Sequence, residues 1–73
     1  MTPRDWDTLR VIGAGPGVIL PAELGRLLGV QTATAREYTL HLVGRGLVDR
    51  QRMADGQVIY EITEAGRAAL EER

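Results

Sequence analysis

The sequence predicts a single α+β domain that combines four helices with three short strands. Apolar residues recur at helical spacing in four segments, and glycine or proline stands between these segments. An Asp-Gly pair, typical of a hairpin turn, separates residues 47–53 from residues 58–62. Because 73 residues have room for only one domain, we assign residues 1–73 to it.

The first predicted helix begins after Thr2, which can cap it, with Pro3 at its first position and Asp5 in its first turn. Its apolar side is expected to consist of Trp6, Leu9, Val11 and Ile12. The glycine-rich segment 13–17 ends this helix. We expect a connector there, since a phosphate-binding loop would follow a strand and carry Lys-Ser or Lys-Thr. Residues 18–20 (Val-Ile-Leu) form a first short strand.

A second helix is predicted from Pro21, with a buried stripe of Leu24, Leu27 and Leu28. Gly29 can adopt the left-handed conformation that ends it, and Gly25 in its middle predicts the close approach of a neighbouring helix. The third helix covers residues 31–45 and begins at Gln31 or Thr32. Its buried face is expected to consist of Ala35, Tyr38, Thr39 and Leu42.

Residues 47–53 and 58–62 are predicted to pair around the turn 54–57, because both Asp55 and Gly56 tolerate positive φ. Thr63 then caps a last helix with Glu64 in its first turn. This helix is expected to pack on the domain through Ala65, Ala69 and Leu70. The resulting order is helix, strand, helix, helix, strand, strand, helix, which is that of a winged helix-turn-helix.

Three segments carry a resemblance to a known family. They are residues 24–30, residues 31–45 with the following Gly-Leu-Val-Asp-Arg (46–50), and residues 62–72. They resemble winged helix transcriptional regulators of the MarR type, over about residues 18–72. The resemblance implies sequence-specific binding of double-stranded DNA, with helix 31–45 in the major groove and hairpin 47–62 as a wing on the backbone. We also expect a homodimer, because one domain this small buries too little DNA surface for high affinity.

By the same resemblance, the groove-facing start of the third helix consists of Gln31, Thr32, Ala33, Thr34, Arg36 and Glu37. The wing residues are Arg50, Arg52, Asp55 and Gln57. Arg36 is the foremost candidate for a base contact, since a guanidinium can bond to N7 and O6 of guanine; the alternative is an arginine paired with a carboxylate. Thr32 and Thr34 can donate to phosphates or cap the helix, and Glu37 can accept from cytosine N4 or be a solvated charge.

Arg45, Arg50 and Arg52 form the only local basic cluster, which Asp49 interrupts. If side chains alternate along the strand, Arg50 and Arg52 share one face, as contact with a phosphate strand requires. The alternative is an ordinary solvated strand face. The formal net charge of −1, with arginine supplying all nine positive charges, argues against strong non-specific DNA binding.

Leu40 and Val43 stand where MarR-type proteins usually carry charged residues, and the long helices through which those proteins dimerise are not found in these 73 residues. Together with Trp6, we assign Leu40 and Val43 to a dimer or partner interface. The alternatives are that the first helix covers Leu40 and Val43 and that Trp6 anchors the core. A second functional hypothesis is a winged helix docking module (a small inhibitor or adaptor) that binds a protein, and not DNA, through Leu40, Val43 and the hairpin. The acidic balance of the chain also favours this hypothesis.

Several kinds of function are not expected from this sequence. His41 has no His, Cys or carboxylate at ligand spacing, so we expect no metal or other cofactor. One histidine and no cysteine give no recognisable nucleophile–base arrangement, so we expect no enzyme. The first residues lack a signal peptide and no apolar run is long enough for a membrane span, which favours a cytoplasmic protein.

Overall fold

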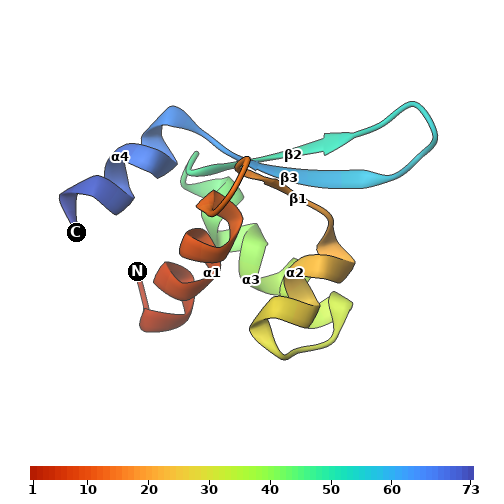
Figure 1. The fold of residues 1–73 in the computed structure, drawn as a ribbon, viewed down its shortest axis with the longest axis horizontal. Helices are drawn as coiled ribbons and strands as arrows, with labels where there is room; N and C mark the ends of the chain where they lie inside the picture. The colour runs from red at the N-terminus through yellow and green to blue at the C-terminus, as the bar shows by residue number, and fades with distance from the viewer.

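The computed structural model describes all 73 residues and contains four helices and three strands (Figure 1). The helices are α1 (Pro3–Gly13), α2 (Pro21–Leu28), α3 (Thr32–Gly44) and α4 (Glu64–Glu72). The strands are β1 (Val18–Ile19), β2 (Val48–Arg52) and β3 (Val58–Ile62). Their order, α1-β1-α2-α3-β2-β3-α4, is the predicted one, so the winged helix-turn-helix fold is confirmed.

The helix ends are fixed by local hydrogen bonds and backbone conformations. At the start of α1, the Thr2 hydroxyl accepts from the Asp5 amide at 3.2 Å, and the Asp5 carboxylate accepts from the Thr2 amide at 3.0 Å. At the end of α2, Gly29 has a φ of 74°, the left-handed conformation predicted for it. The Thr63 hydroxyl accepts from the Gly66 amide at 3.0 Å and caps α4. Caps of this kind each contribute about 1 kcal/mol.

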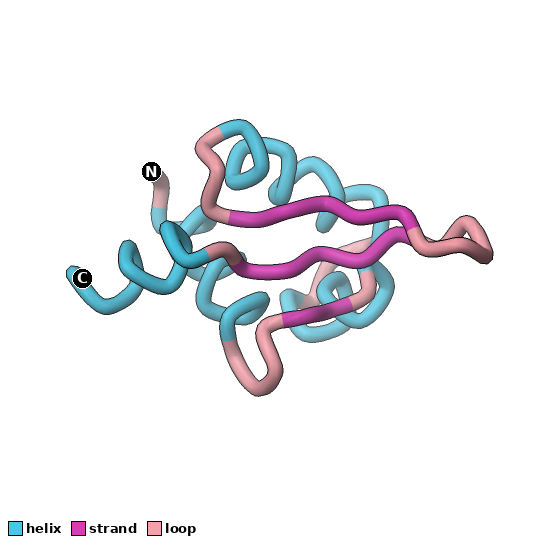
Figure 2. Tube along the Cα trace, turned by 90° about the horizontal axis from the view of Figure 1, so that it is seen from above, coloured by secondary structure: helices cyan, strands magenta, loops and turns pink.

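The three strands form one antiparallel sheet in the order β1-β3-β2, with β3 in the middle (Figure 2). The predicted pairing of these two segments is confirmed, and it runs from Val48 opposite Ile62 to Arg52 opposite Val58. The sheet lies over one side of the helices, and the far end of the β2-β3 hairpin extends beyond them (Figures 1 and 2). We call this hairpin, residues 48–62, the wing.

The turn of the wing uses only one of the two residues that tolerate a positive φ. Gly56 has a φ of 89°, whereas no residue other than glycine, Asp55 included, has a positive φ. The loop is held by the Met53 amide, which donates to the Gln57 carbonyl at 2.6 Å, and by the Asp55 carboxylate, which accepts from the Gln57 amide at 2.9 Å. Because Asp55 bonds the backbone two residues ahead, only Gly56 has to be left-handed.

The core combines side chains from α1, α2, α3 and the two long strands. Its eight members are Leu9, Ile12, Leu24, Ala35, Leu42, Val48, Tyr60 and Ile62. Two expectations about the core were wrong, since Leu27 is 58 % exposed and Ala65 is also exposed. The buried side of α2 passes through Leu24, Gly25 and Leu28, which turns Leu27 towards solvent. In α4 the buried residue is Gly66, with Ala69 and Leu70 packed at the core edge.

Gly25 positions the start of α3. A Cβ added at Gly25 would lie 2.9 Å from the Val30 carbonyl oxygen and 3.3 Å from the Thr32 amide nitrogen. The close approach predicted for Gly25 is therefore made by the connection to α3 and by its first residue. No helix in the structure has the length and apolar character needed to span a membrane.

Candidate nucleic-acid interface

Helix α3 buries one side and exposes the other. The buried residues are Ala35, Thr39 and Leu42, three of the four that the sequence predicted, while Tyr38 is half-buried. The exposed residues of the helix are Ala33, Arg36, Glu37, Leu40, His41 and Gly44. Since successive helical residues are rotated by about 100°, Glu37 and Gly44 lie farthest from the core, opposite Ala35, Thr39 and Leu42. Ala33 and Leu40 lie between this line and Arg36 on one flank, and His41 lies on the other flank.

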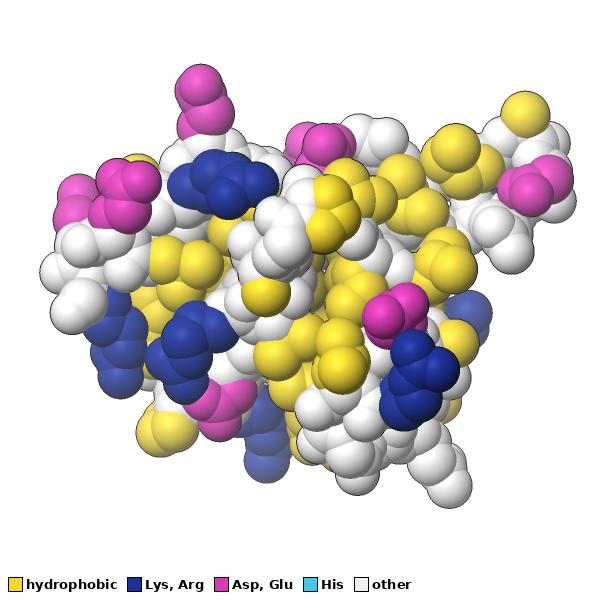
Figure 3. All heavy atoms as spheres, viewed as in Figure 1, with side chains coloured by type: hydrophobic (Ala, Val, Ile, Leu, Met, Phe, Trp, Pro, Cys, Tyr) yellow, Lys and Arg dark blue, Asp and Glu magenta, His cyan; other side chains and the backbone are white.

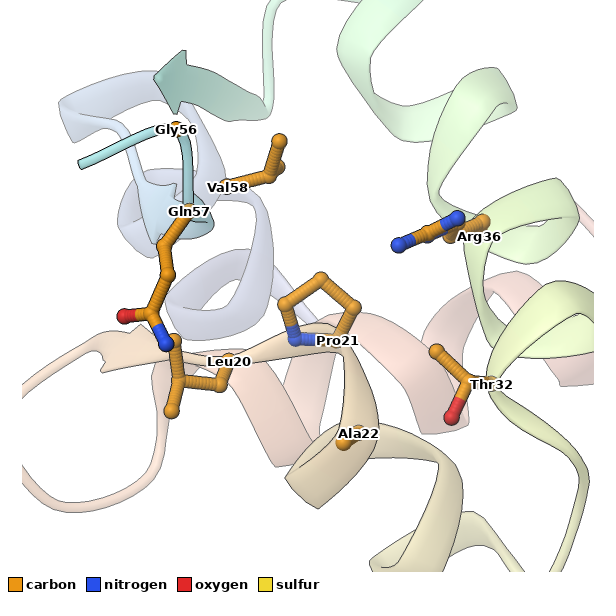
Figure 4. A pocket seen from close by; sticks show the side chains of 8 residues that line it. All are labelled: Leu20, Pro21, Ala22, Thr32, Arg36, Gly56, Gln57 and Val58. Atoms are coloured by element: carbon orange, nitrogen blue, oxygen red, sulfur yellow. The ribbon is translucent and has the colours of Figure 1, made fainter. Parts of the chain in front are cut away.

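On the Arg36 flank, the helix faces the wing across a shallow pocket of about 250 Å³ (Figure 4). Thr32 and Arg36 line it from α3, and Gln57 and Val58 line it from the wing. Leu20, which connects β1 to α2, and the first two residues of α2, Pro21 and Ala22, close the remaining side. The Arg36 side chain extends from α3 towards the wing (Figure 4). The fold thus brings together two regions that the sequence assigned separately to DNA contact.

The two faces of the wing carry opposite charges. Residues directly opposite in an antiparallel pair share one face. Arg50 stands opposite Tyr60 and Arg52 opposite Val58, so both arginines lie on the side of the sheet whose apolar residues pack on the helices. Asp49 stands opposite Glu61 on the outer face, where Gln51 donates to the Glu61 carboxylate at 3.1 Å. The expectation that Arg50 and Arg52 share a face is therefore confirmed, and that face is the one turned towards the helices.

The nine arginines fall into two groups. Arg10 pairs with Asp7 and Arg26 with Glu23, while two others stack on aromatic rings, Arg4 on Tyr38 and Arg73 on Trp6. Four of the remaining five are the arginines singled out from the sequence, Arg36, Arg45, Arg50 and Arg52. None of these four has a carboxylate within ion-pair distance. The alternative of a carboxylate partner for Arg36 is therefore not realised, and all four guanidinium groups are exposed to solvent.

The remaining predicted DNA residues lie at the ends of α3 and at the tip of the wing. Gln31 is the N-cap residue of α3, but its side chain makes no capping hydrogen bond. Thr32 is the first residue of the helix, so it does not play the capping role considered for it; Thr34 is half-buried. Arg45 follows the last turn of α3, at the opposite end of the helix from Thr32.

On the other flank, α3 faces the start of α1. His41 Nδ1 lies 3.2 Å from the Asp5 carboxylate, and the Arg4 guanidinium lies 4.6 Å from the centre of the Tyr38 ring. The pKa of Asp5 is lowered chiefly by the hydrogen bond from the Thr2 amide; burial opposes this effect and His41 adds to it. Sequence reasoning missed the contact between His41 and Asp5, because 36 residues separate them and no local pattern connects them. The structure contains no cluster of His, Cys, Asp or Glu that could hold a metal ion.

The three residues assigned to an interface have different environments. Trp6 is half-buried at the core edge, with the Arg73 guanidinium 4.4 Å from the centre of its ring. Val43 is also half-buried against the core, whereas Leu40 is 65 % exposed. Of the two residues of α3 expected to form an apolar patch, only Leu40 is therefore mostly exposed.

Comparison with known proteins identifies the family. A model of the MarR family matches residues 1–57, which include α1 and extend further towards the N-terminus than the resemblance inferred from sequence. A probable transcriptional regulator from Pseudomonas aeruginosa is 34 % identical and superposes with a TM-score of 0.86 over 99 % of this chain and 55 % of its own. A transcriptional regulator from Thermotoga maritima is 31 % identical, with a TM-score of 0.81 over 97 % of this chain and 50 % of its own.

A mutant MarR from E. coli, crystallised with operator DNA, is 26 % identical and has a TM-score of 0.87 over 99 % of this chain and 52 % of its own. No curated protein matches the chain. The chain spans about half the length of the solved proteins that it matches. The family match covers most of the chain and agrees with the fold and with the resemblance seen in the sequence, so the chain belongs to the MarR family.

Proposed function

We propose that the chain is a sequence-specific transcriptional regulator that binds double-stranded DNA, with α3 in the major groove and the wing on the backbone. The observation that carries this proposal is the sorting of charge on the wing. Arg50 and Arg52 lie on the face turned towards the helices, and the acidic pair of Asp49 and Glu61 lies on the outer face. A duplex held between α3 and the inner side of the wing would meet the arginines and not the carboxylates.

This sorting matters because the chain as a whole is slightly acidic, with a formal net charge of −1. Phosphate contacts supply most of the affinity of a protein for non-specific DNA. Attraction must therefore come from a local field, and the unpaired guanidinium groups of Arg36, Arg50 and Arg52 would provide it. Arginine suits this role because its planar fork of donors matches the geometry of a phosphate or of a guanine edge.

Helix α3 would supply the sequence preference. Arg36 projects from its exposed side and has no carboxylate partner, so its donors are available to N7 and O6 of guanine. Gln31 at the helix N-cap makes no capping bond, and its amide would be available to adenine. Thr32, Thr34 and Arg45 are assigned to phosphates, and Gln57 to the DNA backbone beside the wing.

We further infer that two copies bind together. The longest dimension of the chain is 35 Å, close to the roughly 34–36 Å between half-sites one helical turn apart. One copy would therefore cover about one half-site, and a two-fold symmetric operator would bind a pair. Sedimentation velocity of the chain, alone and with duplexes of one and two half-sites, would test this. Binding of a single copy to the longer duplex would contradict it.

The experiment that tests DNA binding is a comparison of charge variants on a random-sequence duplex. We expect the double variant Arg50→Ala/Arg52→Ala to bind more weakly than the wild-type chain. Its slope of log K against log salt should be shallower by about 2, since each of the two lost phosphate contacts contributes about 0.9 to the slope. Arg10→Ala is the matched control, because Arg10 is paired with Asp7 and lies on α1 away from the wing. Equal binding by the double variant and the wild-type chain would contradict the proposal.

An apolar band favours one alternative function, a docking module for a protein partner. On the face shown in Figure 3, hydrophobic side chains gather over β1 and the adjoining helices. Val18 and Leu27, which are 39 % and 58 % exposed, line a groove there together with Val11 and Pro16. If the chain fails to bind any duplex at low salt, this band becomes the surface through which a partner would be sought.

A further inference from the structure

Two apolar residues, Ala33 and Leu40, lie on the exposed side of α3 between Glu37 and Arg36. They are seven residues apart, about two helical turns, so their side chains point nearly the same way. Leu40 is 65 % exposed and is the most exposed large apolar side chain of the protein. A helix that enters the major groove would bring its exposed side, which carries Arg36, Leu40 and Ala33, to the base edges.

Leu40 contributes little to the fold. The core residues of α3 lie on the opposite side of the helix, and Leu40 is not among the apolar residues packed at the core edge. Its neighbours one turn away on the exposed side are Arg36, Glu37 and Gly44, and Gly44 offers no side chain to cover it. An apolar side chain of this size in that position points to a contact made outside the chain.

We infer that Leu40, with Ala33, contacts the C5-methyl groups of thymines in the major groove, next to the guanine bound by Arg36. This inference rests on the proposed DNA-binding function and names the base chemistry that the helix recognises. The thymine methyl is the only apolar group that the major-groove edge of the four bases presents. An apolar pair next to Arg36 therefore matches a half-site in which thymine adjoins guanine.

The expected effect is modest and can be measured one methyl at a time. Burying one such group against a leucine side chain strengthens binding about three- to five-fold. Deoxyuridine pairs like thymidine and differs only by lacking this methyl group. Replacing single thymines of a selected half-site by deoxyuridine should weaken binding by that factor at one or two positions and leave the others unchanged.

The decisive comparison uses the same duplexes with two leucine variants of the full chain. Leu40→Ala should bind the thymine and deoxyuridine duplexes equally at the sensitive position that shows the larger effect, since the larger side chain of Leu40 is assigned to it. Leu27→Ala is the matched control, because Leu27 is 58 % exposed but lies on α2 beside β1, and it should keep the three- to five-fold difference. Since both leucines are mostly exposed, both variants should fold, which circular dichroism would check.

The outcomes separate this inference from the function on which it rests. If the wild-type chain binds no duplex at low salt, the proposed function fails and the inference with it. If it binds a selected site but is insensitive to deoxyuridine, or if Leu40→Ala keeps the sensitivity, the inference is wrong and the proposed function stands. A dimer that dissociates in Leu40→Ala while thymine discrimination persists would assign Leu40 to the contact between two copies.

Discussion

His41 Nδ1 on α3 lies 3.2 Å from the carboxylate of Asp5 at the start of α1. The same carboxylate accepts from the Thr2 amide and closes the capping box of α1. Asp5 is buried, whereas the side chain of His41 is 62 % exposed. The Asp5 carboxylate thus caps α1 and also links α1 to α3, the helix proposed to enter DNA. Both contacts of Asp5 should therefore contribute to the stability of the fold, which can be measured.

We expect the stability of the domain to fall in acid because of Asp5. The Thr2 amide holds the pKa of Asp5 below its ordinary value of 3.8, burial opposes this effect, and His41 adds to it. A carboxylate with a lowered pKa in the folded state contributes stability that is complete above 3.8 and is lost as the pH falls through the lower folded value. Asp5→Ala should therefore lose about 0.5–2 kcal/mol at neutral pH.

Urea unfolding of the wild-type chain and Asp5→Ala, from neutral pH down through 3.8, would measure this. The difference between the two proteins should shrink as the pH falls. Asp7→Ala is the control, because Asp7 is exposed and pairs only with Arg10 on the same helix. A difference between Asp5→Ala and wild type that stays constant through the acid range would show that the charge of Asp5 does not stabilise the fold.

Gly66 should not tolerate a larger residue. A Cβ at this position would overlap the Leu47 carbonyl oxygen and the side chain of Ile62, and a backbone oxygen cannot move aside cheaply. Gly66→Ala should therefore destabilise the domain by about 1–3 kcal/mol or more. Gly44→Ala is the matched control, since a Cβ there meets nothing within 4 Å, and it should raise stability by up to about 1 kcal/mol. Thermal unfolding that ranks the two variants in the reverse order would contradict this packing.

Arg36 should determine sequence preference. On a site selected from random duplexes, Arg36→Ala should lose about 1–3 kcal/mol, while its binding to unrelated duplexes should change much less. Arg36→Lys keeps the charge but lacks the planar fork, so it should recover non-specific binding without recovering the preference. Competition titrations with selected and scrambled duplexes would measure both quantities. Unchanged preference in Arg36→Ala would remove Arg36 from the base contacts.

The two faces of the wing should respond differently to an added charge. Gln57 lines the pocket beside Arg36, whereas Gln51 lies on the outer face against Glu61. Gln57→Lys should tighten binding to random duplex. The slope of log K against log salt should become steeper by up to about 0.9, which is the contribution of one phosphate contact. Gln51→Lys adds the same charge and should leave both nearly unchanged. An equal gain from both substitutions would mean that attraction to DNA does not depend on the face of the wing.

The parts of the fold that could be predicted depend on neighbouring residues. Thr2 and Asp5 lie one turn apart, and Gly29 ends α2 by its own conformational freedom, so their roles follow from local sequence. The pairing of residues 47–53 with residues 58–62 also follows from the Asp-Gly turn between them. The register does not follow, because Met53 bonds to Gln57 and the loop contains three residues, 54–56. The family resemblance then identified α3 and the wing as the parts to examine for DNA contact.

The parts that could not be predicted depend on residues far apart in the sequence or on small rotations. The contact of His41 with Asp5 arises only when α1 and α3 pack together. Leu27 fits a helical stripe by spacing, yet the rotation of α2 puts Gly25 and Leu28 on the buried side instead. The direction in which the wing arginines face required the pairing of Arg50 with Tyr60, whose burial is a property of the folded core.

The most direct test of DNA binding is a fluorescence-anisotropy titration of the wild-type chain with random-sequence duplex, first at low salt and then at moderate salt. We expect binding in the micromolar range at low salt that weakens steeply as salt is added, because released counterions drive contact with phosphates. No binding at low salt, where electrostatic attraction is strongest, would contradict the assignment of α3 and the wing to DNA.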